Sequence, residues 1–163
     1  MADREVISVR CNAINKNGTR CKRQTKRSDK CWNHLAKDEG LRIKKSTVPG
    51  AGLGLFAAKD FKKDTKVVDY KGEVSDHPSG GDYVLEINPH RFIDARKSIY
   101  AGGFANTLRK GQKGTLNSKL TSYRSEGRIK STRPIKAGKE VLCAYGKSYW
   151  KRGEKSENFV CRY

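Results

Sequence analysis

The sequence predicts a mainly β domain of small sheets, preceded by a short segment that carries most of the cysteines. Between residues 40 and 150, short apolar runs recur at regular spacing and are separated by Gly, Pro, Asn and Asp. None of these runs has the length or the 3.6-residue apolar stripe of a helix. Three of the five cysteines instead lie within the first 31 residues, where apolar periodicity is almost absent. A chain of 163 residues has room for one compact domain and a small appendage.

Eight apolar runs are expected to form strands. They cover residues 41–44, 53–57, 66–70, 83–87, 91–94, 119–123, 128–132 and 140–144. Residues 61–68 and 135–142 share a pattern of a turn followed by a strand, which is too short to imply a repeat fold. Composition divides the chain into a Cys/His segment at 1–38, the β domain at 40–150 and a charged tail at 151–163.

The net charge is strongly positive, since 36 Lys and Arg oppose 17 Asp and Glu and give +19. Such a surplus on a small body indicates a polyanionic partner such as nucleic acid or chromatin, although a merely solubilising surface is the alternative. Eight of the 17 acids fall within residues 60–94, so we expect one acidic groove on a basic protein. No apolar run approaches the roughly 20 residues of a membrane span, and residues 1–10 lack the apolar core of a signal peptide.

The early cysteines have the spacing of a metal site. Cys11-x9-Cys21-x9-Cys31-x2-His34 supplies three thiolates and one imidazole, a complete tetrahedral set for structural zinc. A segment of about 30 residues with so few large apolar side chains could hardly fold without a bound metal ion. Trp32 lies between two of the ligands in sequence, and we expect it to pack against them. The alternative is that the cysteines are free thiols; an odd count of five fits metal better than disulfides.

Four motifs follow in a fixed order. They are Val-Pro-Gly-Ala-Gly-Leu-Gly-Leu-Phe-Ala at 48–57, Tyr-Lys-Gly-Glu at 70–73, Phe-Ile-Asp-Ala-Arg at 92–96 with Gly-Phe-Ala-Asn at 103–106, and Ile-Lys-Ala-Gly-Lys-Glu-Val-Leu-Cys-Ala-Tyr-Gly at 135–146. Together they resemble the SET domain of protein-lysine methyltransferases, in particular the compact SET enzymes encoded by some large viruses. The resemblance implies the SET fold of small sheets with a knot-like C-terminal region, preceded here by a zinc knuckle. It also implies S-adenosylmethionine as the methyl donor.

The resemblance assigns roles to residues of this chain. Tyr145 matches the family's catalytic tyrosine, which orients the lysine amine. The cofactor is expected to contact Ala51, Gly52, Leu53, Tyr83, Asn106 and Thr107. The channel for the substrate lysine is expected to involve Tyr70, Cys143, Phe159 and Tyr163. The sequence departs from the family at Thr107, where a histidine is usual, and it lacks the Cys-rich segment that follows many SET domains.

Methyl transfer from a sulfonium requires a neutral amine. A free lysine has a pKa near 10.4, so its neutralisation at pH 7 costs roughly 4–5 kcal/mol. Desolvation of the amine beside the positive sulfonium lowers that cost.

The sequence thus predicts a protein-lysine N-methyltransferase that acts on histone or other basic protein tails in the nucleus. We expect the basic N-terminal segment to contact nucleic acid, and we expect no membrane association. The alternative is a catalytically weak SET fold and zinc knuckle that bind nucleic acid or chromatin. The sequence leaves the oligomeric state open, a homodimer included.

Overall fold

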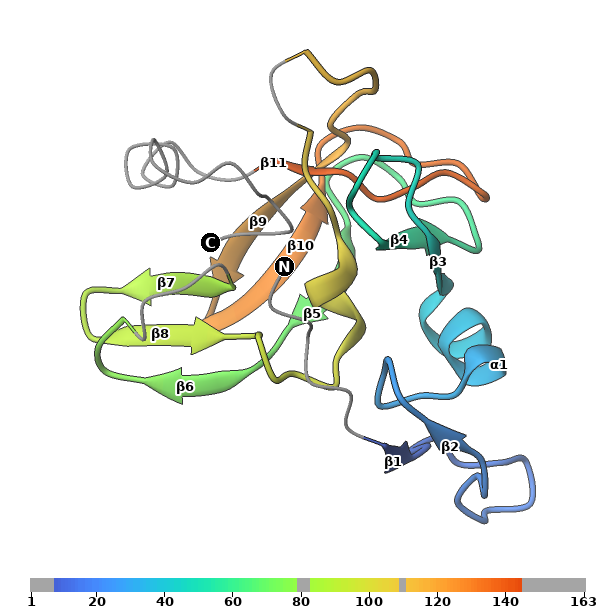
Figure 1. Ribbon diagram of the computed structural model, residues 1–163. Helices are drawn as coiled ribbons and strands as arrows, with labels where there is room; N and C mark the ends of the chain where they lie inside the picture. The colour runs from blue at the N-terminus through green and yellow to red at the C-terminus, as the bar shows by residue number, and fades with distance from the viewer. Residues whose placement is uncertain (1–7, 79–82, 109–110, 145–163) are drawn as a thin grey trace.

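The computed structural model describes residues 8–78, 83–108 and 111–144, which form four small sheets and three short helical turns (Figure 1). The expected mainly β architecture is confirmed. One sheet has the strand order β11-β9-β10-β5, formed by Cys143–Ala144, Ser118–Tyr123, Glu126–Ser131 and Lys66–Tyr70. A second has the order β6-β8-β7, formed by Glu73–Ser75, Arg91–Asp94 and Val84–Asn88. The hairpin of β3 (Leu41–Lys45) and β4 (Leu53–Ala57) is the third, and β1 (Val9–Arg10) with β2 (Gln24–Thr25) is the fourth.

The main core lies between the β3–β4 hairpin and the four-stranded sheet. Its most deeply buried members are aliphatic residues of β3, β4, β10 and the segment before β11: Leu41, Leu55, Ile129, Ile135 and Val141. The three-stranded sheet packs against the end of β10, where Gly127 leaves no room for a Cβ atom beside Leu85 and Ile93. Strand β11 is the exception to the antiparallel pairing, because it runs parallel to β9.

The two turn-then-strand segments noted in the sequence pair with each other. The N–H of Phe61 donates to the carbonyl of Ile135 at 2.8 Å, and the N–H of Ile135 donates back at 2.9 Å. Each segment then turns through a residue with positive φ, Asp64 at 64° and Gly138 at 86°. The shared sequence pattern therefore reflects two equivalent turns that are hydrogen-bonded to one another in the core.

Residues 140–144 run between two other parts of the chain. The N–H of Cys143 donates to the carbonyl of Asn106 at 2.7 Å, and the N–H of Ser118 donates to the carbonyl of Leu142 at 3.1 Å. The strand expected at 140–144 is thus reduced to β11 with isolated bridges at Glu140 and Leu142. The expectation of a knot-like C-terminal region concerns residues after 144 as well, which lie outside the described residues.

The segment before β3 is built differently. After β2, helix α1 (Trp32–His34) continues as a single π-helical turn, η1 (Leu35–Glu39), and ends at Gly40 with φ 70°. Leu35 anchors this helix in the main core, whereas the residues before it form a separate small cluster of Cys11, Cys21 and Cys31 with Ala13. Figure 1 shows β1 and β2 extending away from the other sheets.

The eight expected strands all have counterparts, while β1, β2, α1–η1, β6 and the 3-10 turn η2 (Ala101–Phe104) were not expected. Within the described ranges, no helix has the length and apolar character needed to span a bilayer.

Candidate cofactor site and metal centre

The Gly-rich loop is the connection between β3 and β4. It is closed by the N–H of Ser46, which donates to the carbonyl of Gly52 at 2.8 Å. Gly50 and Gly52 have φ of 76° and 69°, which other residues rarely adopt, and a Cβ added at either would meet nothing within 4 Å. Val48 and Ala51 are buried and pack against Leu142. The loop is therefore fixed on one side by apolar packing and open at its glycines, where a ligand could approach the backbone closely.

Asn106 lies directly beneath this loop and is only 1% exposed. Its side-chain nitrogen donates to the carbonyl of Leu53 at 3.0 Å, to the hydroxyl of Ser46 at 3.1 Å and to the carboxylate of Glu140 at 3.2 Å. Its side-chain oxygen is buried and has no hydrogen-bond partner among the described residues. Such an atom costs about 1–3 kcal/mol when it is left unpaired, so Asn106 Oδ1 is suited to accept a hydrogen bond from a ligand.

Glu140 supports the start of the loop from below. Its carboxylate is 6% exposed and accepts hydrogen bonds from the hydroxyl of Ser46 at 2.6 Å and the backbone N–H of Thr47 at 2.7 Å. The hydroxyl of Thr47 is a further donor to the same group. Gly54 makes this arrangement sterically possible, because a Cβ there would lie 2.1 Å from Glu140 Oε1.

Of the predicted cofactor residues, the structure brings Leu53 and Asn106 into direct contact, with Ala51 and Gly52 in the same loop. Thr107 follows Asn106 and is also buried. Tyr83 lies instead with Tyr70, whose hydroxyl donates to the Tyr83 carbonyl at 2.9 Å. Both tyrosines belong to a cluster at the inner face of the three-stranded sheet.

The predicted catalytic and channel residues are described only in part. Cys143 is fully buried, contributes to the main core, and is tied by its backbone to Asn106. Tyr70 is likewise fully buried. Tyr145, Phe159 and Tyr163 lie outside the described residues.

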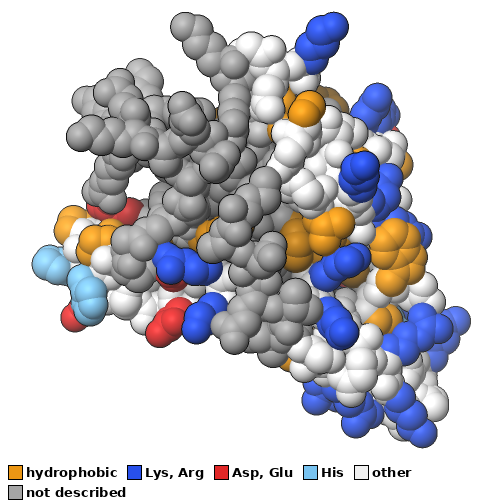
Figure 2. Space-filling model, in the orientation of Figure 1, with side chains coloured by type: hydrophobic (Ala, Val, Ile, Leu, Met, Phe, Trp, Pro, Cys, Tyr) orange, Lys and Arg blue, Asp and Glu red, His pale blue; other side chains and the backbone are white. Residues whose placement is uncertain are grey.

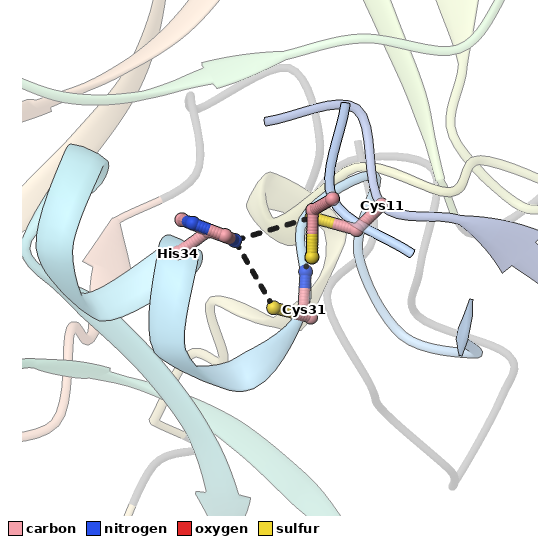
Figure 3. Close-up of side chains that lie close together, drawn as sticks. Cys11, Cys31 and His34 are labelled. Carbon is pink, nitrogen blue, oxygen red and sulfur yellow. Dashed lines mark hydrogen bonds between the residues drawn. The ribbon is translucent and has the colours of Figure 1, made fainter. Parts of the chain in front are cut away.

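The four predicted zinc ligands converge on one point. The donor atoms of Cys11, Cys21, Cys31 and His34 all lie within 4.8 Å of one another. Nδ1 of His34 is 3.3 Å from the Cys31 sulfur and 3.6 Å from the Cys11 sulfur (Figure 3). In a tetrahedral zinc site the ligand atoms lie about 3.5–3.8 Å apart, so the two His34–sulfur distances are close to those of a zinc site, and the four donors together could hold one ion.

The surroundings of the sulfurs also favour metal binding. Burial raises the pKa of Cys31, but the backbone N–H and the ring of His34 together with Cys11 outweigh burial and lower that pKa to about 7. Burial raises the pKa of Cys11. The thiolate form that binds zinc is thus favoured at Cys31, next to the imidazole ligand.

One expectation about this segment was wrong. Trp32 does not pack between the ligands; it is 51% exposed, and the guanidinium of Arg42 stacks 4.4 Å from its ring centroid. The reason is helix α1, which turns His34 toward the sulfurs and Trp32 outward.

The acidic residues of 60–94 do not line a single groove within the described residues. Several pair with nearby bases on the surface: Asp60 with Lys136, Asp64 with Lys130, Asp69 with Lys66 and Asp94 with Arg96. A pocket of about 300 Å³ does hold carboxylates, but three of its four, Asp29, Asp38 and Glu39, precede β3 in the chain and only Asp69 belongs to this stretch. The pocket lies between that segment and β5.

Comparison with known proteins identifies the fold. No family model matches the sequence. The structure is similar to the methyltransferase domain of human PR domain-containing protein 2, with a TM-score of 0.53 and 21% identity over 78% of this chain and 88% of that one. The chain has the SET fold. It is also similar to apo ctPRC2 in an autoinhibited state, with a TM-score of 0.49 and 24% identity over 64% of this chain and 15% of that one.

A curated relative supports the recognition made from the motifs. The histone-lysine N-methyltransferase EZH2 of Chaetomium thermophilum is 29% identical over 123 residues, which cover 64% of this chain. The chain spans only 8% of the length of that relative. The resemblance to SET-domain lysine methyltransferases is thus confirmed.

The sequence analysis did not predict the hydrogen bonds that hold the start of the Gly-rich loop. These bonds join Ser46 and Thr47 to Glu140. The available signal was a lone acidic residue at the start of the apolar run Val-Leu-Cys-Ala, in a stretch that passes through the core. A carboxylate in such a place needs hydrogen-bond donors, and two hydroxyl residues precede the Gly-rich loop.

Proposed function

We propose that this protein is an S-adenosylmethionine-dependent protein-lysine N-methyltransferase that acts on basic protein tails such as those of histones. The observation that carries the proposal is Asn106, a buried amide with a free acceptor oxygen beneath an open Gly-rich loop. The name of the EZH2 relative, a histone-lysine N-methyltransferase, supports the substrate class. A histone substrate supports a nuclear location.

The residues present fit the proposed cofactor. The carbonyl of Leu53 and the carboxylate of Glu140 can only accept hydrogen bonds, so the amide of Asn106 must turn its nitrogen toward them. Its oxygen is then left to accept from an N–H group, such as an amine of the ligand. We assign the loop residues Ala51, Gly52 and Leu53 to the same ligand by close backbone approach.

The chemistry that S-adenosylmethionine supplies when bound is a methyl group on a positively charged sulfonium. The protein must hold the lysine amine in line with that group and keep it neutral. We assign the orientation of the amine to the hydroxyl of Tyr145, which follows β11 directly in sequence. Tyr70, Cys143, Phe159 and Tyr163 remain the proposed walls of the lysine channel.

A second role is proposed for the N-terminal segment, which we expect to bind the phosphate backbone of nucleic acid. Its exposed bases, which cover the lower right of Figure 2, are Arg10, Lys16, Arg20, Lys22, Arg23, Lys26, Arg27 and Lys37. Asp29 and Asp38, by contrast, line the pocket beside β5, together with Glu39. Exposed bases therefore greatly outnumber exposed acids in the described part of the segment. Zinc would act here as a structural clamp that holds this surface in shape.

Salt dependence tests the nucleic-acid contact. Several phosphate contacts would lower affinity by orders of magnitude between about 50 and 200 mM salt. A triple variant of Lys22, Arg23 and Lys26 to Gln should flatten the dependence of duplex DNA binding on salt. Three exposed SET-domain lysines, Lys62, Lys63 and Lys139, changed to Gln provide a control of equal charge. Equal slopes for the two variants would show that binding reflects net charge alone.

Transfer of a labelled methyl group tests the enzymatic proposal. Purified protein is incubated with labelled S-adenosylmethionine and a panel of core histones, alongside its Tyr145→Phe variant. Label on histone from the wild type alone supports the proposal. Labelling by neither protein, together with intact nucleic-acid binding, would favour the alternative of a catalytically weak SET fold that binds chromatin.

A further inference from the structure

The buried carboxylate of Glu140 connects two parts of the proposed cofactor site that are far apart in sequence. It accepts hydrogen bonds from Ser46 and Thr47 at the start of the Gly-rich loop, more than 90 residues away. It also accepts from the side-chain nitrogen of Asn106. All of these donors are neutral groups: two hydroxyls, a backbone N–H and an amide. Burial of a carboxylate costs free energy unless hydrogen bonds compensate for the lost water. The positions of Ser46, Thr47 and Asn106 around Glu140 should therefore be tightly restricted.

The carboxylate also helps to orient the Asn106 amide. The side-chain nitrogen has three acceptors around it, from Ser46, Leu53 and Glu140. A donor at position 140 would no longer attract that nitrogen, and the amide oxygen would compete for the same side. The acceptor at position 140 therefore supports, together with the carbonyl of Leu53, the orientation that leaves Oδ1 buried and without a partner among the described residues.

We propose that Glu140 is a positioning residue for the cofactor, which fixes the amide of Asn106 and the first residues of the Gly-rich loop in the geometry that binds the ligand. This inference rests on the proposed function, because the ligand is the proposed methyl donor. It goes beyond the family resemblance, which assigned no role to Glu140, Ser46 or Thr47. Its alternative is that Glu140 serves the stability of the fold only.

The test measures binding of S-adenosylhomocysteine, the methyl-depleted form of the cofactor, by titration calorimetry. Glu140→Gln keeps the size of the side chain but removes its charge and replaces one of its two acceptor oxygens with a donor NH2 group. Loss of hydrogen bonds to a charged group predicts binding about ten- to a hundredfold weaker. Glu140→Asp, which retains a carboxylate, should recover part of this affinity and is the gentler variant if Gln disturbs folding. Ser131→Ala is the matched control, since Ser131 is equally buried and hydrogen-bonded to Lys62 and Thr65, away from the site.

A double-mutant cycle separates positioning from stability. If Glu140 acts through Asn106, the Gln variant should change affinity by less than about threefold in an Asn106→Ala background. Full additivity of the two substitutions, or an affinity loss in Ser131→Ala equal to that in Glu140→Gln, would overturn the positioning role. Unchanged binding in Glu140→Gln would also overturn it. Failure of the wild type itself to bind S-adenosylhomocysteine would instead overturn the proposed function on which the inference rests.

Discussion

Removal of one zinc ligand should disorder the N-terminal segment while the SET core stays folded. We consider Cys21→Ala. Apart from the three thiols, the buried cluster of this segment contains only Ala13. Burial of that methyl group contributes about 0.8 kcal/mol, whereas structural zinc supplies about 10–16 kcal/mol in small zinc-finger peptides. Metal therefore outweighs apolar packing in this cluster by an order of magnitude, and three remaining ligands should not hold the segment.

Amide hydrogen exchange and metal analysis together measure the effect. In the wild type, the N–H of Cys11 donates to the carbonyl of Arg23 at 2.8 Å, and protection of this amide should be lost in Cys21→Ala. The N–H of Val141 donates to the carbonyl of Leu55 in the main core and should stay protected. Cys143→Ala is the control, because Cys143 is a buried cysteine that lies outside the zinc-ligand cluster. The wild type and this control should each bind one zinc. Protection at Cys11 that persists without zinc would refute the reasoning.

Four further predictions concern the SET domain. Gly54→Ala should weaken S-adenosylhomocysteine binding and destabilise the fold by about 1–3 kcal/mol, since its Cβ would lie 2.1 Å from Glu140 Oε1; calorimetry and thermal unfolding check both. Gly138→Asn should be nearly neutral in the same assays, because Asn tolerates the positive φ and nothing lies within 4 Å. Leu55→Ala should cost about 2–5 kcal/mol in denaturant unfolding, since Leu55 is fully buried in the main core; a cost under about 1 kcal/mol would contradict the packing described. The proposed enzyme should add more than one methyl group, because the SET resemblance places Cys143 where many of these enzymes have the larger Tyr or Phe; only monomethyl peptide at exhaustive turnover, by mass spectrometry, would contradict this.

Strands could be predicted from the sequence where their residues are buried and therefore apolar. β4, β5 and β8 have the expected bounds because their apolar residues face a core on at least one side. β6 was missed because Glu73 and Val74 are exposed, and pairing with β8 rather than burial defines this strand. Helix α1–η1 was missed because it is too short for an apolar stripe to be visible.

The zinc site and the cofactor site also differ in how far the sequence predicts them. The zinc ligands were predictable because four soft donors within 24 positions restrict one another, and the structure brings all four together. The loop support was not predictable, because Glu140 meets Ser46 and Thr47 only through the passage of residues 140–144 between Asn106 and β9. Tertiary contacts of this kind leave no local periodicity in the sequence.

Mapping the methylated residue tests the central claim most directly. Wild-type protein and Tyr145→Phe are each incubated with S-adenosylmethionine and unmodified core histones, and the products are analysed by tandem mass spectrometry. The account predicts methyl groups on the side-chain nitrogen of specific histone lysines with the wild type, and a strong loss of product with Tyr145→Phe. Methylation of another residue type, or equal product from both proteins, would contradict it.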